Sequence, residues 1–135
     1  MSGEYLALQV IMMPRDANPL PSPNVGFRTI FGGILLSYID QAGAVGAVRE
    51  VVQAGGERPY LLTVALNRVE FLKPVLVGDV VRFVTRLVKI GRTSITMNIR
   101  VEAERGKEVI GVTEAEAVYV GIDVSAPEPK PKPLL

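Results

Sequence analysis

Hydrophobic and polar residues alternate most regularly between Thr93 and Glu104. The apolar positions of this stretch are Ile95, Met97, Ile99, Val101 and Ala103. A period of two is typical of a β-strand with one buried face. Apolar segments at 61–71, 80–90 and 108–120 also predict strands, and short turn sequences separate several of them. Short turns favour antiparallel neighbours, so we expect the four strands to form a meander.

One long segment lacks this alternation and predicts a helix. From Ile34 to about Ala54 there is no proline, and apolar residues cover nearly every helical face. A helix that is apolar on all sides is buried. Gly32 and Gly33 open the segment, and a second glycine pair at 55–56 ends it, as helix C termini prefer. Four small residues leave room for a backbone or a ligand to approach closely: Gly43, Ala44, Gly46 and Ala47.

The remaining segments complete a single domain. Residues 5–13 predict an opening strand, and the proline-rich stretch 16–29 predicts a long loop. The whole order indicates an α+β fold over residues 1–125, with an antiparallel sheet of about five strands wrapped around one long helix. Residues 126–135 contain four prolines and two lysines, so we expect an extended or flexible tail without a catalytic role.

The composition excludes several classes of function but says little more about the fold. The 135 residues carry a formal net charge of +1, from 15 basic and 14 acidic side chains, which gives no support for a nucleic-acid or membrane-surface binder. There is no cysteine and no histidine, so disulfides, thiolate metal sites and Ser-His-Asp triads are excluded. Chemistry must therefore use carboxylates, hydroxyls, amides or backbone groups, and we expect neither a metal nor a resident cofactor.

The compartment is predicted from the same sequence. The N-terminal residues show no pattern of a secretory signal, and the apolar stretch 30–48 contains Asp40 and many small residues. These features are typical of a buried helix rather than a membrane span. We therefore expect a cytoplasmic protein.

Asp40 is the candidate catalytic group because it is the only charged residue between positions 30 and 48. Burying a carboxylate without partners costs several kcal/mol, on the order of the penalty for unpaired polar groups. It could face a polar gap or a subunit contact, or it could serve a reaction. The pair Gly32-Gly33 could reflect tight packing alone. Alternatively, its N–H groups at the helix N terminus could bind an anion or a developing oxyanion, about two turns from the carboxylate.

The segment from Ile30 to Ala44 reads Ile-Phe-Gly-Gly-Ile-Leu-Leu-Ser-Tyr-Ile-Asp-Gln-Ala-Gly-Ala. It resembles the helix motif of the hot-dog-fold acyl-CoA thioesterases, in which an aromatic residue or histidine and a Gly-Gly pair precede the catalytic acid. Segments 13–18, 69–79 and 89–95 are also similar to that family, in the order in which the family has them. The similarity spans roughly residues 8 to 122.

This resemblance implies a hot-dog fold that hydrolyses an acyl-CoA, with coenzyme A present only as part of the substrate. Asp40 would be the general base or the nucleophile, and the N–H of Gly33, with Gly32, would polarise the thioester carbonyl. Leu36, Ile39 and Gly43 are candidate neighbours of the acyl chain.

At the coenzyme end, the resemblance places Thr93 and Ser94 near coenzyme A and makes Arg92 a candidate for binding its phosphates. It also implies a homodimer as the minimum unit, and possible assembly into a tetramer or hexamer. Burial of an apolar helix favours such pairing on physical grounds as well.

The chain departs from the family pattern in the loop before the helix. The segment 18–29 looks longer and richer in proline than the related loops. Thr29 stands where the family often has a helper Asn or Asp, and Asn24 or Asn18 could replace that group. Acyl chain length, and coenzyme A against acyl carrier protein as the carrier, stay open at this point.

Three other functions were weighed against hydrolysis. The first is a hot-dog domain that binds or senses acyl-CoA without cleaving it, although no DNA-binding segment precedes Tyr5. A hydratase of the same fold is disfavoured because such enzymes generally use histidine. The last is a domain that has lost its activity and survives as part of an oligomer.

Overall fold

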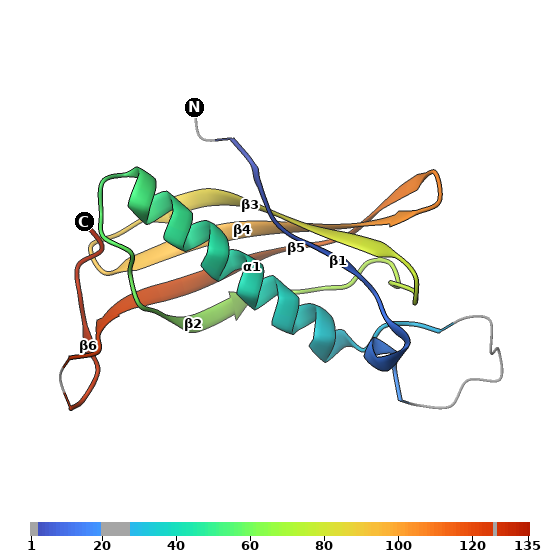
Figure 1. Cartoon of the computed structure of the whole chain (residues 1–135), viewed down its shortest axis with the longest axis horizontal. Coiled ribbons are helices and arrows are strands. Elements are labelled where there is room, and N and C mark those ends of the chain that lie inside the picture. Colours follow the sequence, from blue (N-terminus) through green and yellow to red (C-terminus); the bar gives the residue numbers. More distant parts are fainter. Residues whose placement is uncertain (1–2, 20–27, 126) are drawn as a thin grey trace.

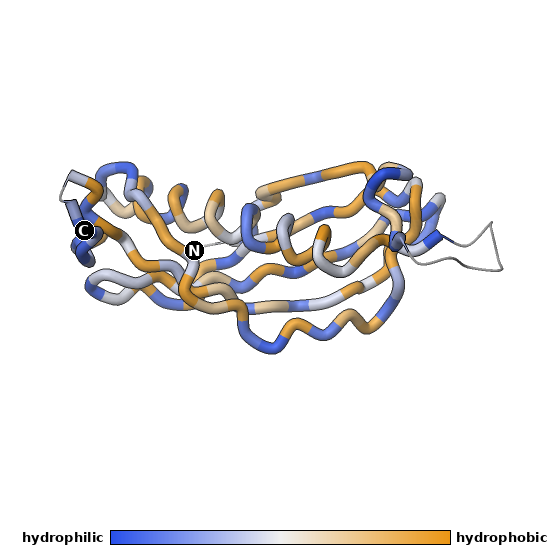
Figure 2. Tube along the Cα trace, turned by 90° about the horizontal axis from the view of Figure 1, so that it is seen from below, coloured by the Kyte–Doolittle hydropathy of each residue, from blue (hydrophilic) through white to orange (hydrophobic). Residues whose placement is uncertain are grey.

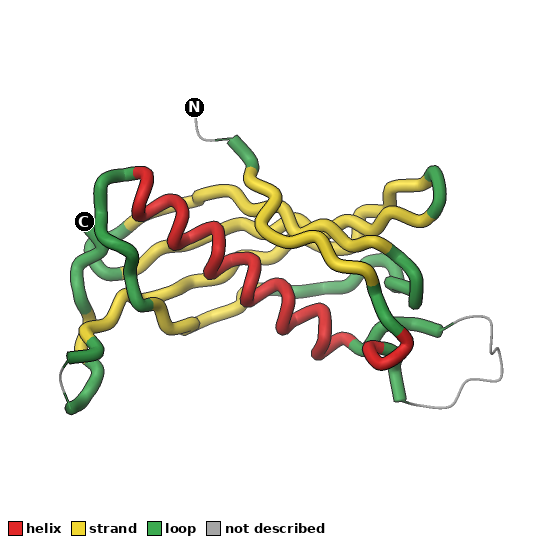
Figure 3. Tube along the Cα trace, in the orientation of Figure 1, coloured by secondary structure: helices red, strands yellow, loops and turns green. Residues whose placement is uncertain are grey.

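The computed structural model describes residues 3–19, 28–125 and 127–135 (Figure 1). Its elements in chain order are β1 (Tyr5–Ile11), a 3-10 helix η1 (Pro14–Asp16), α1 (Gly32–Gln53), β2 (Leu61–Asn67), β3 (Val80–Ile90), β4 (Ser94–Arg105), β5 (Glu108–Asp123) and β6 (Lys130–Pro131). The strands form one antiparallel sheet in the order β1-β3-β4-β5-β2, and β6 pairs with β5. Helix α1 crosses one face of this sheet (Figure 3). The predicted α+β architecture is confirmed.

The alternation along β4 correctly predicted which side chains form the core. Its five apolar positions are all 1% exposed or less, and they face α1. The polar residues between them lie on the outer face of the sheet, so apolar and polar colours alternate along the strands (Figure 2). Because successive side chains of a strand point to opposite faces, this local pattern determines the burial of the whole strand.

The predicted meander is correct only for β3, β4 and β5. Strand β2 lies beside β5 at the edge of the sheet and does not pair with β3. It also ends at Asn67, before the predicted Phe71, and the next residue, Arg68, has a φ of 50° that strand geometry does not allow. The long connection 68–79 is not a tight turn, so it can carry the chain across the end of the sheet.

Helix α1 is buried on one side, whereas the sequence predicted burial on all sides. The residues that pack against the sheet are Leu35, Ile39, Ala42, Gly43, Gly46, Ala47 and Val51. On the opposite side of the helix, Val45 and Val52 are 40% and 47% exposed, and Phe31, which directly precedes α1, is 48% exposed. One small sheet can cover only one side of a helix, so an apolar strip of α1 faces outward.

A glycine allows α1 to approach the sheet closely at one point. A Cβ atom added to Gly43 would lie 2.2 Å from the Tyr119 hydroxyl oxygen, well inside contact distance. The space beside Gly43, where the sequence predicted room for a backbone or a ligand, is filled by a side chain of β5. Within the described residues, no helix combines the length and the apolar character that crossing a membrane requires.

The C-terminal segment is extended, as the sequence allowed, but its described residues pack against the sheet. The Lys132 N–H donates a hydrogen bond of 2.8 Å to the Gly121 carbonyl. Leu134 is only 4% exposed and belongs to the hydrophobic core. The prolines in this segment do not prevent the packing, because an edge strand needs only some of its N–H groups.

Candidate active site

Asp40 lies half-buried on α1, and its carboxylate has a partner on a different element. The hydroxyl of Thr63, on the edge strand β2, donates a hydrogen bond of 2.7 Å to Oδ1 of Asp40. Nothing in the sequence distinguishes Thr63, because a threonine in a strand is an ordinary β-former. Its role becomes visible only when α1 is placed across the sheet.

The main chain of Asp40 is held at the same place. The buried hydroxyl of Tyr119 donates a hydrogen bond of 2.7 Å to the backbone carbonyl of Asp40. Tyr119 on β5 and Thr63 on β2 are register partners, so their side chains lie on the same face of the sheet. One row of the sheet therefore binds both the side chain and the backbone of Asp40.

Burial and the neighbouring Asp40 charge raise the pKa of Tyr119 well above its ordinary value, burial having the larger effect. The phenol therefore stays protonated over the whole range in which the protein would work. It therefore keeps the O–H group that donates to the backbone carbonyl of Asp40.

The N terminus of α1 presents backbone donors. The Phe31 N–H is bonded to the Asp16 carbonyl at 3.0 Å, and the Ile34 N–H is bonded to the Phe31 carbonyl at 3.0 Å. The first N–H groups of a helix have no acceptor within the helix, and no acceptor among the described residues occupies those of Gly32 and Gly33. Gly33 is exposed, so its N–H can reach an external oxygen.

Gly33 and Asp40 lie about two helical turns apart on α1. Seven residues separate Gly33 from Asp40, which corresponds to about 10 Å along the helix axis and nearly two full turns. Both residues therefore lie on one side of α1. Helical side chains tilt toward the N terminus, so the carboxylate points back toward the free N–H groups.

The loop before α1 contains the three residues suggested as polar helpers of Asp40, and the structure describes two of them, Asn18 and Thr29. The Thr29 carbonyl accepts the Asn18 N–H at 2.8 Å, and Thr29 forms an isolated bridge with Leu76. Thr29 and Asn18 thus fix the backbone that leads into α1, while Asn24 lies outside the described residues. A catalytic part for any of the three stays a prediction.

The turn proposed for coenzyme A lies at the other end of α1. Arg92 and Thr93 connect β3 to β4, and Ser94 begins β4. This turn is next to the C-terminal end of the helix, whereas Gly32 and Gly33 lie at its N-terminal end (Figure 1). A single chain therefore does not bring residues 92–94 together with the Gly32-Gly33 pair.

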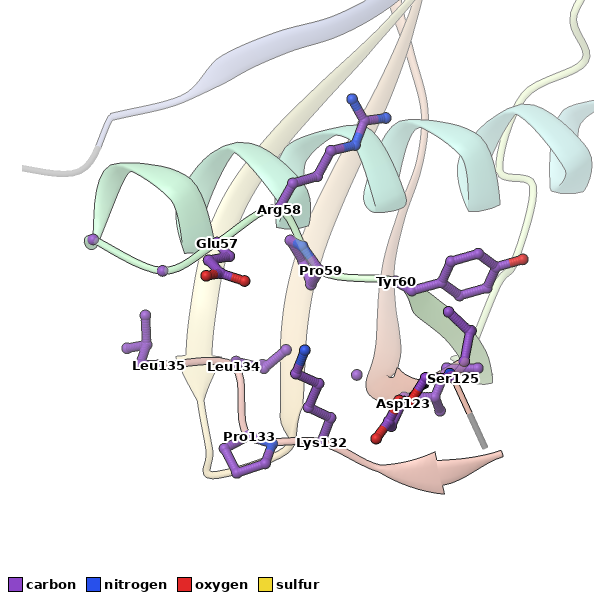
Figure 4. A pocket seen from close by; sticks show the side chains of 15 residues that line it. Glu57, Arg58, Pro59, Tyr60, Asp123, Ser125, Lys132, Pro133, Leu134 and Leu135 are labelled. Carbon is purple, nitrogen blue, oxygen red and sulfur yellow. Dashed lines mark hydrogen bonds between the residues drawn. The ribbon is translucent and has the colours of Figure 1, made fainter. Parts of the chain in front are cut away.

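Two cavities lie away from Asp40. One of about 790 Å³ is bounded by residues 55–60, 121–125 and 132–135 (Figure 4). Another of about 470 Å³ is lined by residues 73–74, 105 and 108–111. Neither of these two cavities includes Asp40 or Gly33. Within the described residues there is also no group of three or more side chains suited to hold a metal ion.

Comparison with known proteins assigns the chain to a family. The model of the thioesterase superfamily matches residues 27–110. The chain therefore belongs to the thioesterase superfamily, as the sequence motifs predicted. It is similar to the acyl-CoA thioester hydrolase YciA of Salmonella typhimurium, with 39% identity over 123 residues that cover 87% of this chain and 83% of the relative.

Solved structures agree with this assignment. The hexameric thioesterase y2039 from Yersinia pestis has a TM-score of 0.78 and 35% identity, covering 98% of this chain and 97% of its own. Cj0915, a hexameric hotdog fold thioesterase of Campylobacter jejuni, has a TM-score of 0.78 and 34% identity, covering 97% and 90%. The predicted hot-dog fold is confirmed.

Proposed function

We propose that this chain hydrolyses the thioester bond of acyl-CoA substrates, with Asp40 as the catalytic carboxylate. The observation that carries the proposal is the hydrogen bond of 2.7 Å from Thr63 to the Asp40 carboxylate, on the same side of the helix as the free Gly33 N–H. Family membership and the name of the Salmonella relative support the same reaction. No metal or resident cofactor is needed, because a thioester carbonyl is already reactive toward a suitably activated water.

The reaction proceeds in two steps. The substrate carbonyl oxygen accepts a hydrogen bond from the Gly33 N–H, with that of Gly32 nearby, and the positive end of the helix dipole stabilises the developing oxyanion. Asp40 removes a proton from water, whose oxygen bonds to the carbonyl carbon. The carbon–sulfur bond then breaks, the carbonyl reforms, and the proton held by Asp40 passes to the leaving thiolate. The products are the free acid and coenzyme A.

Asp40 could instead attack the carbonyl carbon itself and form a mixed anhydride. A single turnover in water labelled with ¹⁸O detects the anhydride route when water opens the anhydride at the aspartyl carbon. Opening at the acyl carbon places the label in the acid, as general-base catalysis does. General-base catalysis places the label in the acid product alone. Label recovered in the Asp40 carboxylate would show that an anhydride had formed and that water had opened it at the aspartyl carbon.

We propose a homodimer as the minimum active unit, assembled further into a tetramer or hexamer. Val45 and Val52 expose an apolar strip on α1, and β2 is an edge strand with one unpaired side. A second copy would cover both surfaces and would bring another 92–94 turn to the site. Light scattering measures the assembly directly, and an active monomer would refute this part of the proposal.

We also place the protein in the cytoplasm, where its acyl-CoA substrates are found.

The test is thiol release from a panel of short, medium, long and aromatic acyl-CoA thioesters. The chain has no cysteine, so a thiol reagent records only the released coenzyme A. Asp40→Asn is nearly isosteric and should reduce turnover by about 10²-fold or more, which is the usual scale for loss of a general base. Near-normal turnover by this variant would remove Asp40 from the mechanism. Tight acyl-CoA binding without turnover by the unmodified protein would instead identify a binding domain.

A further inference from the structure

The C-terminal segment is bonded to the turn that is proposed to bind coenzyme A. The Leu134 N–H donates a hydrogen bond of 3.0 Å to the Arg92 carbonyl. The next carbonyl of the turn, that of Thr93, accepts the Gly121 N–H of β5 at 2.8 Å, and the Gly121 carbonyl in turn accepts the Lys132 N–H. Two consecutive carbonyls of the turn are thus fixed, one by the C-terminal segment directly and one through β5.

The side chain of Leu134 anchors this segment. It is 4% exposed, while the adjacent Leu135 is 66% exposed. A Cβ atom added to Gly121 would lie 2.7 Å from Cδ2 of Leu134, so the glycine leaves the space that this side chain fills. Lys132 and Leu134 also form one wall of the cavity of about 790 Å³, opposite residues 57–60 (Figure 4).

We propose that the C-terminal segment, anchored by Leu134, is a positioning element that holds the 92–94 turn in the conformation that binds the phosphorylated end of coenzyme A. This inference rests on the proposed function and on the role proposed for the turn. Arg92 is exposed, and a free hairpin turn would lose conformational entropy on binding. A turn that is already fixed by backbone hydrogen bonds loses less, so the ligand binds more tightly without any new contact.

The experiment compares two substrates that carry the same acyl group. One is the acyl-CoA, and the other is the acyl thioester of N-acetylcysteamine, which lacks the nucleotide and all phosphates. Leu134→Ala should raise the KM for acyl-CoA by about 5- to 20-fold, the cost of ordering one or two more side chains on binding, with kcat unchanged within about twofold. The KM for the short thioester should stay the same.

The adjacent leucine provides the matched control. Leu135→Ala removes the same atoms from an exposed position and should leave both KM values unchanged. Leu134→Met keeps the apolar volume and should restore the KM of the unmodified protein. Thermal melting shows whether each variant is folded. If Leu134→Ala does not fold, Leu134→Val tests the same point, with an expected KM increase of about 2- to 5-fold.

The outcomes separate this inference from the proposed function. An unchanged KM for acyl-CoA in folded Leu134→Ala would overturn the positioning role. Equal losses with both substrates would also overturn it, because they would show general damage to the fold. An unmodified protein that cleaves neither thioester would refute the proposed function, whatever the variants do.

Discussion

The hydrogen bond between Thr63 and Asp40 offers the sharpest test of the site. Thr63→Val replaces the hydroxyl by a methyl group, keeps the β-branched shape that a strand prefers, and removes only the donor. Thr63→Ser keeps the hydroxyl and removes the methyl group. The two variants therefore separate the hydrogen bond of 2.7 Å from the packing of the side chain.

The expected size of the effect follows from the environment of the pair. A hydrogen bond to a charged group contributes about 1.5 to 3 kcal/mol. Thr63 is exposed and Asp40 is half-buried in the single chain, so the lower end of this range applies. About 1.4 kcal/mol of lost transition-state stabilisation is a factor of ten. We therefore expect kcat to fall about tenfold in Thr63→Val, while KM changes little because the carboxylate acts on the reacting centre.

The assay is steady-state thiol release from one acyl-CoA, with thermal melting as a check on folding. Thr96→Val is the matched control, since Thr96 lies on β4 between residues that face the core and therefore points to the outer face of the sheet. It should retain normal turnover. Thr63→Ser should retain most of the activity. A Thr63→Val variant as active as the unmodified protein, or a Thr63→Ser variant as impaired as Thr63→Val, would refute the positioning of Asp40 by this hydroxyl.

Three further predictions concern the surroundings of the site. Tyr119→Phe removes the hydroxyl that donates to the Asp40 carbonyl, so kcat should fall by a few fold. The free energy of unfolding, measured by denaturant titration, should fall by about 0.5 to 1.5 kcal/mol. An unchanged kcat would show that this hydrogen bond does not position the carboxylate. Gly43→Ala should lower the free energy of unfolding by about 1 to 3 kcal/mol in the same titration, because the new methyl group would lie 2.2 Å from the Tyr119 hydroxyl oxygen. A stability equal to that of the unmodified protein would contradict this close contact. Burial would raise the pKa of Asp79, but the hydrogen bonds from Arg105 and from a backbone N–H outweigh burial and hold this pKa below its ordinary value. The Asp79 carboxylate therefore stabilises the fold above about pH 4, and this stabilisation is lost as the pH falls through the lowered pKa. Asp79→Asn should therefore lower the Tm at neutral pH, and its difference from the unmodified protein should shrink below about pH 4; Glu4→Gln, at an exposed ion pair, should change the Tm little.

Asp79 also illustrates how the fold supports the helix N terminus. Its carboxylate accepts hydrogen bonds from Arg105 and from the Leu76 N–H, and Leu76 forms a bridge with Thr29. Ile30, which follows Thr29 in the chain, donates its N–H to the Val75 carbonyl at 2.8 Å. The backbone that leads into Gly32 and Gly33 is thus tied to residues 75–79, just before β3.

The sequence by itself determined the elements and the chemistry that they can carry. The period-two alternation of β4 predicted its buried face, and the proline-free apolar segment predicted α1 close to its observed bounds. The absence of histidine and cysteine limited catalysis to groups such as Asp40, and the Gly32-Gly33 pair left open whether it serves tight packing or provides backbone donors for an anion. These features are local, because the geometry of a strand or helix relates only residues that are close in the chain.

The tertiary structure alone decided the partners. Thr63 is 23 residues from Asp40 and Tyr119 is 79 residues from it, and neither shows a local signal that distinguishes it from other strand residues. The placement of β2 beside β5 and the packing of Leu134 against the Arg92 turn are decided in the same way. Such contacts depend on how the whole chain buries its apolar surface, and this global balance cannot be read from any short stretch of residues.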